Sequence, residues 1–529
     1  MTSHHYRGDT MSGHTSKGLQ STAHPPGRQS SSQRLGPSIE HLVKMVFFGC
    51  QACSHCLLWE TAFICPMSCP RGLHNGPCRG STPDCCFIDP AKDCIWFRIF
   101  QRAEQQGCLE KLLEVNPPRD NRRMGCESLL RAYQHRHRQS RGPCLRDLLT
   151  NQACFKADWE TFHYKLRQPD WWQGDGQYHP PAYTEPVSGL EARLRNGRFA
   201  ISAEVAPPME PTGDRIARVA HFLKDCVHTA NFTDNPLGVP RMSGLACALH
   251  SLDNDMEPVL QLQTRHRSRY DYEAEAVGAA VVGVRNILCL SDDIGRLGPG
   301  PAPRPELYDL DAVQALWMLR RLRDEEVNVD GEPVEYPPQY LLGATAAPYA
   351  MLPRYEAILT EKKINAGAQF LQTSPILDLD RFAEWLEALD QRNLLGKVYL
   401  MPTIALLKSP RHARFMANEV PGVYLPPAIM ARMEDAADPR EEGIQIALDV
   451  IAGLKGMPGI HGLHILAPGQ EEVVPRLVKQ SGLGDFVPGG GVTSGNGRNT
   501  RLNPSQSTDL PRFDLDNFSG AEYNRNPDM

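Results

Sequence analysis

Cysteine is concentrated near the start of the chain, where nine of the 16 cysteines lie between Cys50 and Cys94. Such density in a long chain indicates metal ligation, because disulfide scaffolds are usually short secreted domains. The run of Cys50, Cys53 and Cys56 is closer to one that wraps a 4Fe–4S cluster than to the paired hairpins of a zinc site. Zinc, alone or beside a cluster, and buried free thiols remain alternatives. The predicted metal ligands are Cys50, Cys53, Cys56, Cys65, Cys69, Cys78, Cys86 and Cys94.

Carboxylates end two of the apolar runs in the second half of the chain. Glu204 interrupts the run at 199–207, where a buried carboxylate is costly unless it is paired or used. It is either salt-bridged to an arginine such as Arg265 or Arg267, or it is an acid that donates a proton. Asp292 and Asp293 are adjacent at the end of another run. One of the two suits a helix N-cap, which leaves the other for chemistry.

Eight short apolar runs alternate with amphipathic stretches and must position these side chains. The runs lie at 199–207, 229–234, 258–264, 286–293, 339–347, 368–374, 397–407 and 460–468. The stretches between them, such as 380–393, repeat apolar residues at three- and four-residue spacing, which predicts helices. Runs that are apolar on both faces are typical of parallel strands covered by helices. Eight such units favour a (β/α)8 TIM barrel over a doubly wound open sheet.

The barrel places its chemistry at the carboxyl ends of its strands and in the loops that follow them. This rule nominates Glu204 on the first strand, and it nominates polar residues that end five further strands. Those residues are Thr233, Gln263, Thr264, Ser291, Asp292, Asp293, Gln372, Ser374 and Lys408.

Composition divides the chain into five parts. Residues 1–35 are polar and rich in Ser, His, Gly and Gln, and residues 486–529 have a similar polar composition, which predicts disordered tails. Residues 36–165 form the cysteine-rich, mainly helical metal-binding module. Residues 166–196 are dense in Pro, Gly and aromatic residues and are predicted to be a linker, and residues 197–485 form the barrel.

Several classes of protein are disfavoured. The net charge of −6 gives no sign of nucleic acid as the main partner. No stretch is long and apolar enough to span a bilayer, and the first residues have no apolar leader, so we expect a cytoplasmic protein. The absence of a Gly-x-Gly-x-x-Gly turn after a strand and of a Walker loop argues against a Rossmann domain or a nucleotide triphosphatase.

The strand-end motifs resemble those of the methylenetetrahydrofolate reductase family over the whole barrel. The matching segments are AEVAPP at 203–208, ANFTDNP at 230–236, NILCLSDD at 286–293, AGAQFLQTSPILD at 366–378 and PTIALLKSPRHARFMANEVPGVYLPPAIMARM at 402–433. The cysteine-rich zone is similar to a module linked to reductases of this family in some bacteria. In those systems, the module carries zinc or an iron–sulfur cluster.

The resemblance implies flavin-dependent reduction of 5,10-methylenetetrahydrofolate to 5-methyltetrahydrofolate. Hydride would pass from NAD(P)H or another electron donor through FAD, with FMN as the alternative flavin. Glu204 would be the general acid, and Asp293 would lie near the flavin. The expected cofactor-binding residues are Thr233, Gln263, Thr264, Ser291, Asp292, Asp293, Ala346 and Lys363. The expected substrate-binding residues are Glu204, Gln372, Ser374 and Lys408.

Two positions depart from the family pattern. Ser374 stands where the family usually has a Gln that contacts the pterin, and Asp292 stands where a Gly usually precedes the acidic residue of the fourth strand. A non-catalytic folate or methyl-carrier protein is therefore one alternative, and an iron–sulfur electron-transfer adaptor is another. We expect a homo-oligomer or docking with a partner redox protein.

Overall fold

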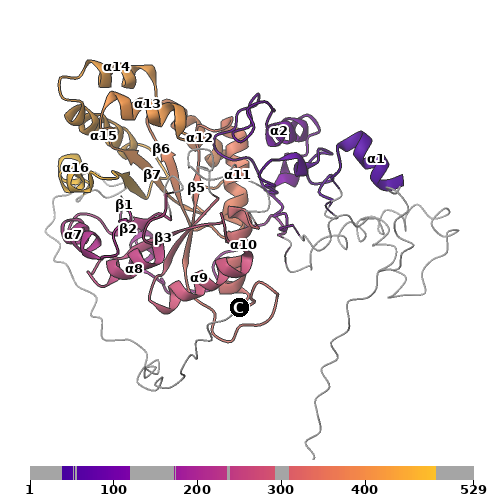
Figure 1. The fold of residues 1–529 in the computed structure, drawn as a ribbon, viewed down its shortest axis with the longest axis horizontal. Helices are drawn as coiled ribbons and strands as arrows, with labels where there is room; N and C mark the ends of the chain where they lie inside the picture. The colour runs from indigo at the N-terminus through magenta and orange to yellow at the C-terminus, as the bar shows by residue number, and fades with distance from the viewer. Residues whose placement is uncertain are drawn as a thin grey trace, which may run out of the picture. The chain divides into compact units, whose positions relative to one another are not determined.

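Eight parallel strands close into a barrel in chain order, β1 to β8 (Figure 1). The computed structural model describes residues 39–51, 53, 56–119, 172, 174–234, 239–291 and 309–483. The strands are β1 (Ala200–Val205), β2 (Thr229–Phe232), β3 (Pro258–Gln263), β4 (Asn286–Leu290), β5 (Leu341–Ala346), β6 (Phe370–Pro375), β7 (Tyr399–Ala405) and β8 (Gly462–Leu466). Each coincides with a predicted apolar run, and only β6 extends one residue past its run, so the TIM barrel is confirmed.

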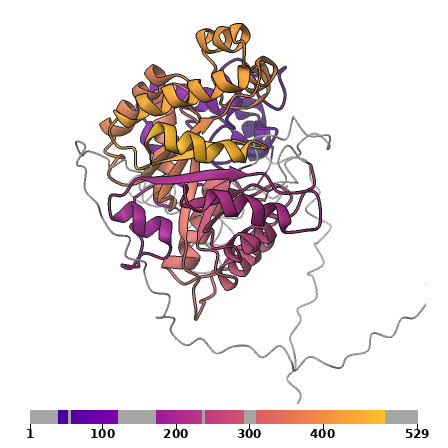
Figure 2. The ribbon, with the colours of Figure 1, turned by 90° about the vertical axis from the view of Figure 1, so that its left-hand side faces the viewer.

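Helices cover the outside of the barrel and pack their apolar faces on the strands (Figure 2). They are α6 (Gly189–Arg195), α7 (Asp214–Leu223), α8 (Gly244–Leu252), α9 (Arg269–Val281), α10 (Ala312–Asp324), α11 (Pro353–Asn365), α12 (Leu379–Gln391), α13 (Pro410–Glu419), α14 (Pro427–Asp435), α15 (Pro439–Lys455) and α16 (Val474–Ser481), with a short 3-10 turn, η8 (Glu471–Val473). Short polar side chains cap many of them. Ser268 and Asp311, for example, form capping boxes at the starts of α9 and α10.

Helix α6 precedes the first strand and closes the amino-terminal end of the barrel. Its Leu190 and Leu194 join a buried cluster with the early strand residues Ala200, Val259 and Leu341. Glu257, just before β3, accepts a hydrogen bond from the backbone nitrogen of Leu190 at 3.0 Å. Because one end of the barrel is filled in this way, its carboxyl end is the end that is available for a functional site.

The cysteine-rich module has its own small core and packs against α11. Its elements are α1 (Ile39–Phe48), η2 (Pro66–Ser68), α2 (Ile95–Gln105) and η3 (Leu109–Leu113). The ring of Phe100 on α2 lies 5.2 Å from that of Tyr355 on α11, and Glu104 pairs with Arg354 at 2.5 Å. The module and the barrel belong to one compact unit, and the module lies beside α10 and α11 in Figure 1.

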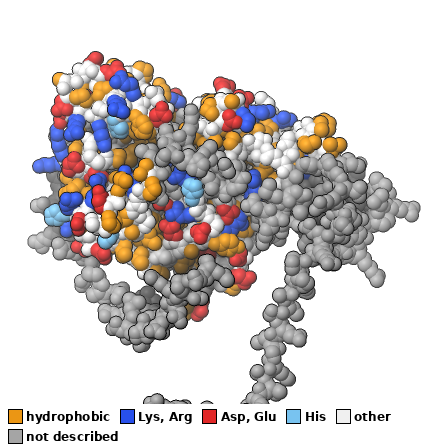
Figure 3. Space-filling view, viewed as in Figure 1, with side chains coloured by type: hydrophobic (Ala, Val, Ile, Leu, Met, Phe, Trp, Pro, Cys, Tyr) orange, Lys and Arg blue, Asp and Glu red, His pale blue; other side chains and the backbone are white. Residues whose placement is uncertain are grey.

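Some predictions fall outside the described residues. They concern the two tails, Asp292 and Asp293 after β4, and the whole of residues 120–171. Helix α1 exposes Val46 and Phe47, and apolar side chains gather at the right of Figure 3 where this helix lies.

None of the helices in the described ranges is long and apolar enough to cross a membrane.

Candidate functional site

Glu204 is buried inside the barrel near the carboxyl end of β1, with 7% of its surface exposed. Its Oε2 accepts a hydrogen bond from Gln261 Nε2 on β3 at 2.6 Å, and His464 Nε2 on β8 lies 3.4 Å from the same oxygen. Arg267, an alternative partner, instead pairs with Asp234 at 2.6 Å and Glu275 at 2.7 Å. The carboxylate is therefore held by an amide and an imidazole.

A chain of polar side chains extends from His464 across the barrel. His464 Nδ1 lies 2.9 Å from Ser202 Oγ, and Gln372 Nε2 donates to that oxygen at 3.2 Å. Asn231 Nδ2 in turn donates to Gln372 Oε1 at 2.8 Å. The network brings together Glu204 and Gln372, two predicted substrate-binding residues. Strand register explains this, because Ser202 pairs with His464 and Glu204 pairs with Asn231.

The predicted flavin-binding residues follow β2, β3, β4 and β5 around one side of the mouth. Gln263 and Thr264 are buried at the end of β3, while Thr233 and Ser291 are half-buried. Ser291 Oγ accepts a hydrogen bond from the first backbone nitrogen of α10 at 2.8 Å. The N-cap of α10 is Asp311 rather than Asp292 or Asp293.

Two further flavin-binding predictions lie at the end of β5. Ala346 is fully buried, and Lys363 on α11 directs Nζ to the carbonyl of Thr345 at 2.7 Å.

A buried polar atom at the end of β3 bears on whether these residues fit a cofactor. Thr264 Oγ1 is buried and has no hydrogen-bond partner among the described residues. Asn231 Oδ1 is likewise buried and has no partner among them. A buried hydroxyl without a partner is costly, and a bound polar group at the mouth would relieve that cost. The residues present therefore fit a flavin, whose ring and side chain carry many hydrogen-bonding atoms.

Ser374 and Lys408, the other two substrate-binding predictions, form their hydrogen bonds with residues outside the Glu204 network. Ser374 is buried, and its Oγ donates to the carbonyl of Ala346 at 3.4 Å. A Cβ added to Gly422 would lie 3.1 Å from Ser374 Oγ, so the loop after α13 packs directly on this serine. Lys408 donates through Nζ to the carbonyl of Pro468 after β8.

The eight predicted metal ligands fall into two groups of four. In the first group, burial raises the pKa of Cys65 to about 12, with smaller contributions from the sulfurs of Cys53, Cys50 and Cys56. In the second group, Cys94 lies near Cys69, Cys86 and Ser81, and Cys78 Sγ is 3.3 Å from Ser81 Oγ.

Both groups consist of thiols that form no disulfide. Buried Arg71 lies beside Cys69 and favours its thiolate against the effect of burial, which raises the pKa of that thiol. In the described ranges, no three Cys, His, Asp or Glu side chains come close enough to hold a metal ion. Four sulfurs are the usual donor set of a zinc ion or an iron–sulfur cluster, so the number of thiols in each group matches such a centre, whereas their described spacing does not.

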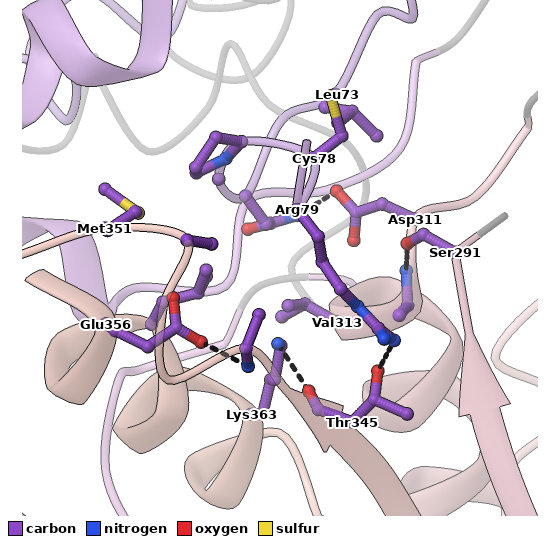
Figure 4. Close-up of a pocket in the computed structure, with 17 residues that line it drawn as sticks. Leu73, Cys78, Arg79, Ser291, Asp311, Val313, Thr345, Met351, Glu356 and Lys363 are labelled. Atoms are coloured by element: carbon purple, nitrogen blue, oxygen red, sulfur yellow. Dashed lines mark hydrogen bonds between the residues drawn. The ribbon is translucent and has the colours of Figure 1, made fainter. Parts of the chain in front are cut away.

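The cysteine-rich module also contributes to the mouth of the barrel. Arg79, which was not among the predicted residues, donates from its guanidinium to Thr345 Oγ1 at the end of β5. It lines a cavity together with Ser291 and Lys363, shown in Figure 4. Only the fold could reveal this residue, because it is 266 positions from Thr345 in the chain.

A buried polar network at the carboxyl end of a closed parallel barrel defines a TIM-barrel protein with the site arrangement of an enzyme. A family model described as Methylenetetrahydrofolate reductase matches residues 189–482, which is more than half of the chain. A second model, described as Methylene-tetrahydrofolate reductase C terminal, matches residues 30–122. The chain belongs to the methylenetetrahydrofolate reductase family, and its barrel is of a reductase type that acts in folate chemistry.

Solved structures resemble part of the chain at low sequence identity. One is a protein from Clostridium thermocellum that binds two copies of 5-methyl-5,6,7,8-tetrahydrofolic acid, with 14% identity, a TM-score of 0.42 and coverage of 55% of this chain and 98% of the other. Another is an F420-dependent secondary alcohol dehydrogenase, with 12% identity, a TM-score of 0.35 and coverage of 54% and 98%. No protein of curated function matches the chain.

Proposed function

We propose that the protein reduces 5,10-methylenetetrahydrofolate to 5-methyltetrahydrofolate with a bound flavin and NAD(P)H or another electron donor. The observation that carries the proposal is the position of Glu204, buried at the carboxyl end of β1 in a barrel of this family. A buried carboxyl group whose orientation is fixed by an amide and an imidazole is positioned to give a proton to a substrate nitrogen.

Glu204 would protonate the pterin so that the five-membered ring opens. Gln261 and His464 would fix the orientation of the carboxyl group, because both contact its Oε2. Gln372 would support this arrangement through Ser202.

A bound flavin would supply the hydride. The flavin would be held by residues that surround the mouth of the barrel from β2 to β5. These residues are Thr233, Gln263, Thr264, Ser291, Ala346 and Lys363. Asp293 remains a proposed flavin neighbour in the loop after β4. FAD and FMN both remain open. Cytoplasmic location and either a homo-oligomer or a partner redox protein remain part of the proposal.

Replacement of Glu204 tests this function through its two half-reactions. Glu204→Gln keeps an oxygen that accepts from Gln261 but removes the acidic proton. We expect reduction of the flavin by NAD(P)H to stay nearly unchanged, and folate reduction to fall by about 100-fold or more. Stopped-flow measurement of flavin absorbance follows both steps. An equal fall in the two half-reactions contradicts the role of Glu204, and a wild-type protein that binds no flavin contradicts the proposed function.

The cysteine-rich module would hold a 4Fe–4S cluster, zinc, or one of each. The two groups of four thiols support this part of the proposal because each matches the ligand number of one centre. Anaerobically purified protein should contain about four iron and four sulfide per cluster, with a broad visible band beneath the flavin spectrum. Stoichiometric zinc without iron would exclude the cluster, and the absence of both metals would leave the cysteines as structural thiols.

A further inference from the structure

Helix α9 is apolar on the face that it turns to solvent as well as on the face that it packs on the barrel. Tyr272, Ala276 and Ala279 form the inner face and are buried. The outer face, which we call the outer stripe, repeats at three- and four-residue spacing and consists of Tyr270, Ala274, Val277, Gly278 and Val281. A helix that is apolar all round is normally buried between two layers of protein.

The outer stripe is open to solvent along its length. Val281 has 81% of its surface exposed and Tyr270 has 56%, and a Cβ on Gly278 would meet nothing within 4 Å. Helix α12 shows the usual pattern of a surface helix, because its exposed side carries the carboxylates of Asp380 and Glu384. Contiguous exposed apolar surface such as the outer stripe marks an interaction site.

The apolar surface continues onto α8, which lies beside α9 on the outside of the barrel (Figure 1). A Cβ on Gly283 would lie 3.7 Å from Leu252 Cδ1, so the carboxyl ends of the two helices adjoin. Leu249 on α8 and Val282 after α9 are both exposed. The apolar surface is thus broader than one helix, as a stable protein interface requires.

The two ends of the outer stripe carry opposite charges. Asp271 is exposed at the amino end, where Tyr270 also donates a hydrogen bond to Asp330 Oδ1 at 3.0 Å. At the carboxyl end, Arg285 Nη1 donates to the carbonyl oxygen of Ala280 at 2.9 Å. An antiparallel arrangement of two such helices brings each acidic end next to a cation.

A hollow of about 620 Å³ opens at the carboxyl end of α9, next to Arg285. Its walls include Tyr183, Pro337 and Pro338, and its charged residues are one of each sign, Glu185 and Arg285. Proline and tyrosine walls suit an aromatic side chain, and an aromatic anchor in a pocket is a common centre of protein interfaces.

We propose that α9 packs against α9 of a second copy of this chain, antiparallel and about a two-fold axis that passes between Val277 and Gly278. In this register, Val277 of each copy faces Gly278 of the other, and Ala274 faces Val281. Large side chains therefore meet small ones, and Tyr270 of each copy comes to the hollow of the other. Both copies use the same surface, which is the property of a two-fold dimer interface.

Charge at the ends of the stripe favours a second copy over an unrelated protein. The antiparallel register places Asp271 of each copy near Arg285 of the other, because the two positions are about equally far from the axis. Complementary charges at the rim of an interface steer association and fix the register. The outer stripe itself holds no charged side chain, so the two-fold axis brings no like charges together. This dimer does not depend on the proposed activity.

Analytical ultracentrifugation of the full chain tests the pairing. The wild type should associate, and Val281→Asp should weaken association about 100-fold or more, because a carboxylate is then buried against the other copy. Val281 is exposed in a single copy, so the variant should keep the wild-type circular dichroism spectrum. Adding Ala274→Lys to Val281→Asp should recover at least about tenfold, because residue 274 of one copy faces residue 281 of the other.

Ala383→Asp is the matched control, because Ala383 is also exposed on a surface helix, α12. It should leave the dissociation constant of the dimer unchanged. A wild type that stays monomeric at every concentration measured would overturn the inference, and so would Val281→Asp that associates like the wild type. Equal weakening by Ala383→Asp would mean that the effect of charge is not specific to α9. Failure of Ala274→Lys to recover association would overturn the antiparallel register.

Discussion

In the network of polar side chains around Glu204, the donor and acceptor of each hydrogen bond can be assigned. Asn231 and Gln372 donate through their amide nitrogens, so the hydroxyl hydrogen of Ser202 is free to point at His464 Nδ1. That arrangement leaves the hydrogen of His464 on Nε2, which faces Glu204 Oε2. In the proposed function, His464 would therefore be a positioning residue that orients Glu204.

Two substitutions of His464 separate its two contacts. The amide of Asn superposes on the Nδ1 side of the ring, and the longer Gln reaches the position of Nε2. We expect His464→Asn to slow folate reduction about tenfold by releasing Glu204, and His464→Gln to restore most of the rate. Flavin reduction by NAD(P)H should be the same in both variants, which stopped-flow absorbance measures. Equally slow folate reduction in both variants, with normal flavin reduction, would contradict the role of Nε2, whereas slow flavin reduction in both would indicate a loss of folding.

The sequence could predict Glu204 but not its partners. Glu204 is conspicuous because it interrupts an apolar strand, and Gln372 follows the rule of strand ends. His464, Ser202 and Gln261 are single polar residues on three different strands, and only the register of the closed sheet brings them together. Ser374 was predicted to be a substrate residue, and its burial beneath Gly422 is a feature of loop packing that spacing does not encode.

At the scale of elements, periodicity predicted the strands and helices, and capping chemistry set where the helices begin. Helix α15 begins at Pro439, because Asp438 accepts from the backbone nitrogens of Arg440 and Glu441. Proline also suits the first helical position, where no backbone hydrogen is needed. The segments from 292 to 308 and from 120 to 171 lie beyond what the structure describes.

Replacement of two helical glycines by alanine should change the stability of the barrel in opposite directions. A Cβ on Gly443 of α15 would lie 1.9 Å from the carbonyl oxygen of Leu407, whereas a Cβ on Gly278 of α9 meets nothing within 4 Å. Gly443→Ala should destabilise the barrel by about 1–3 kcal/mol because α15 must move away from β7. Gly278→Ala should stabilise it by about 0.5–1 kcal/mol through helix propensity. Urea unfolding measures both, and a shift of the same sign in the two variants would contradict the packing argument.

At the scale of the whole molecule, the module and the barrel are joined by buried polar contacts that no local pattern predicts. Asn75 and Asp311 are 236 positions apart in the chain, and their side chains meet at 2.9 Å. Gln314 Nε2 donates to the carbonyl of Asn116 at 3.0 Å, which ties α10 to the end of the module. The sequence divided the chain into a module and a barrel, but the placement of one on the other depends on these long-range pairs.

Substitution of Asp311 tests how strongly its hydrogen bond holds the module on the barrel, because its two carboxylate oxygens bind different parts of the protein. Oδ1 caps α10 through the backbone nitrogen of Gln314, and Oδ2 accepts from Asn75 of the module. Asp311→Ser keeps a capping hydroxyl but is too short to reach Asn75, so the buried Asn75 amide loses one of its two acceptors and keeps the carbonyl of Asn116, at a cost of about 1–3 kcal/mol. The Asp311→Ser variant should lower the thermal midpoint and expose the module to limited proteolysis before the barrel unfolds.

Ser268→Ala is the matched control, because it removes the cap of α9 but no contact with the module. It should cost about 1 kcal/mol without earlier cleavage of the module. Identical proteolysis of Asp311→Ser and the wild type would mean that the apolar packing of Phe100 on Tyr355 holds the module without Asp311.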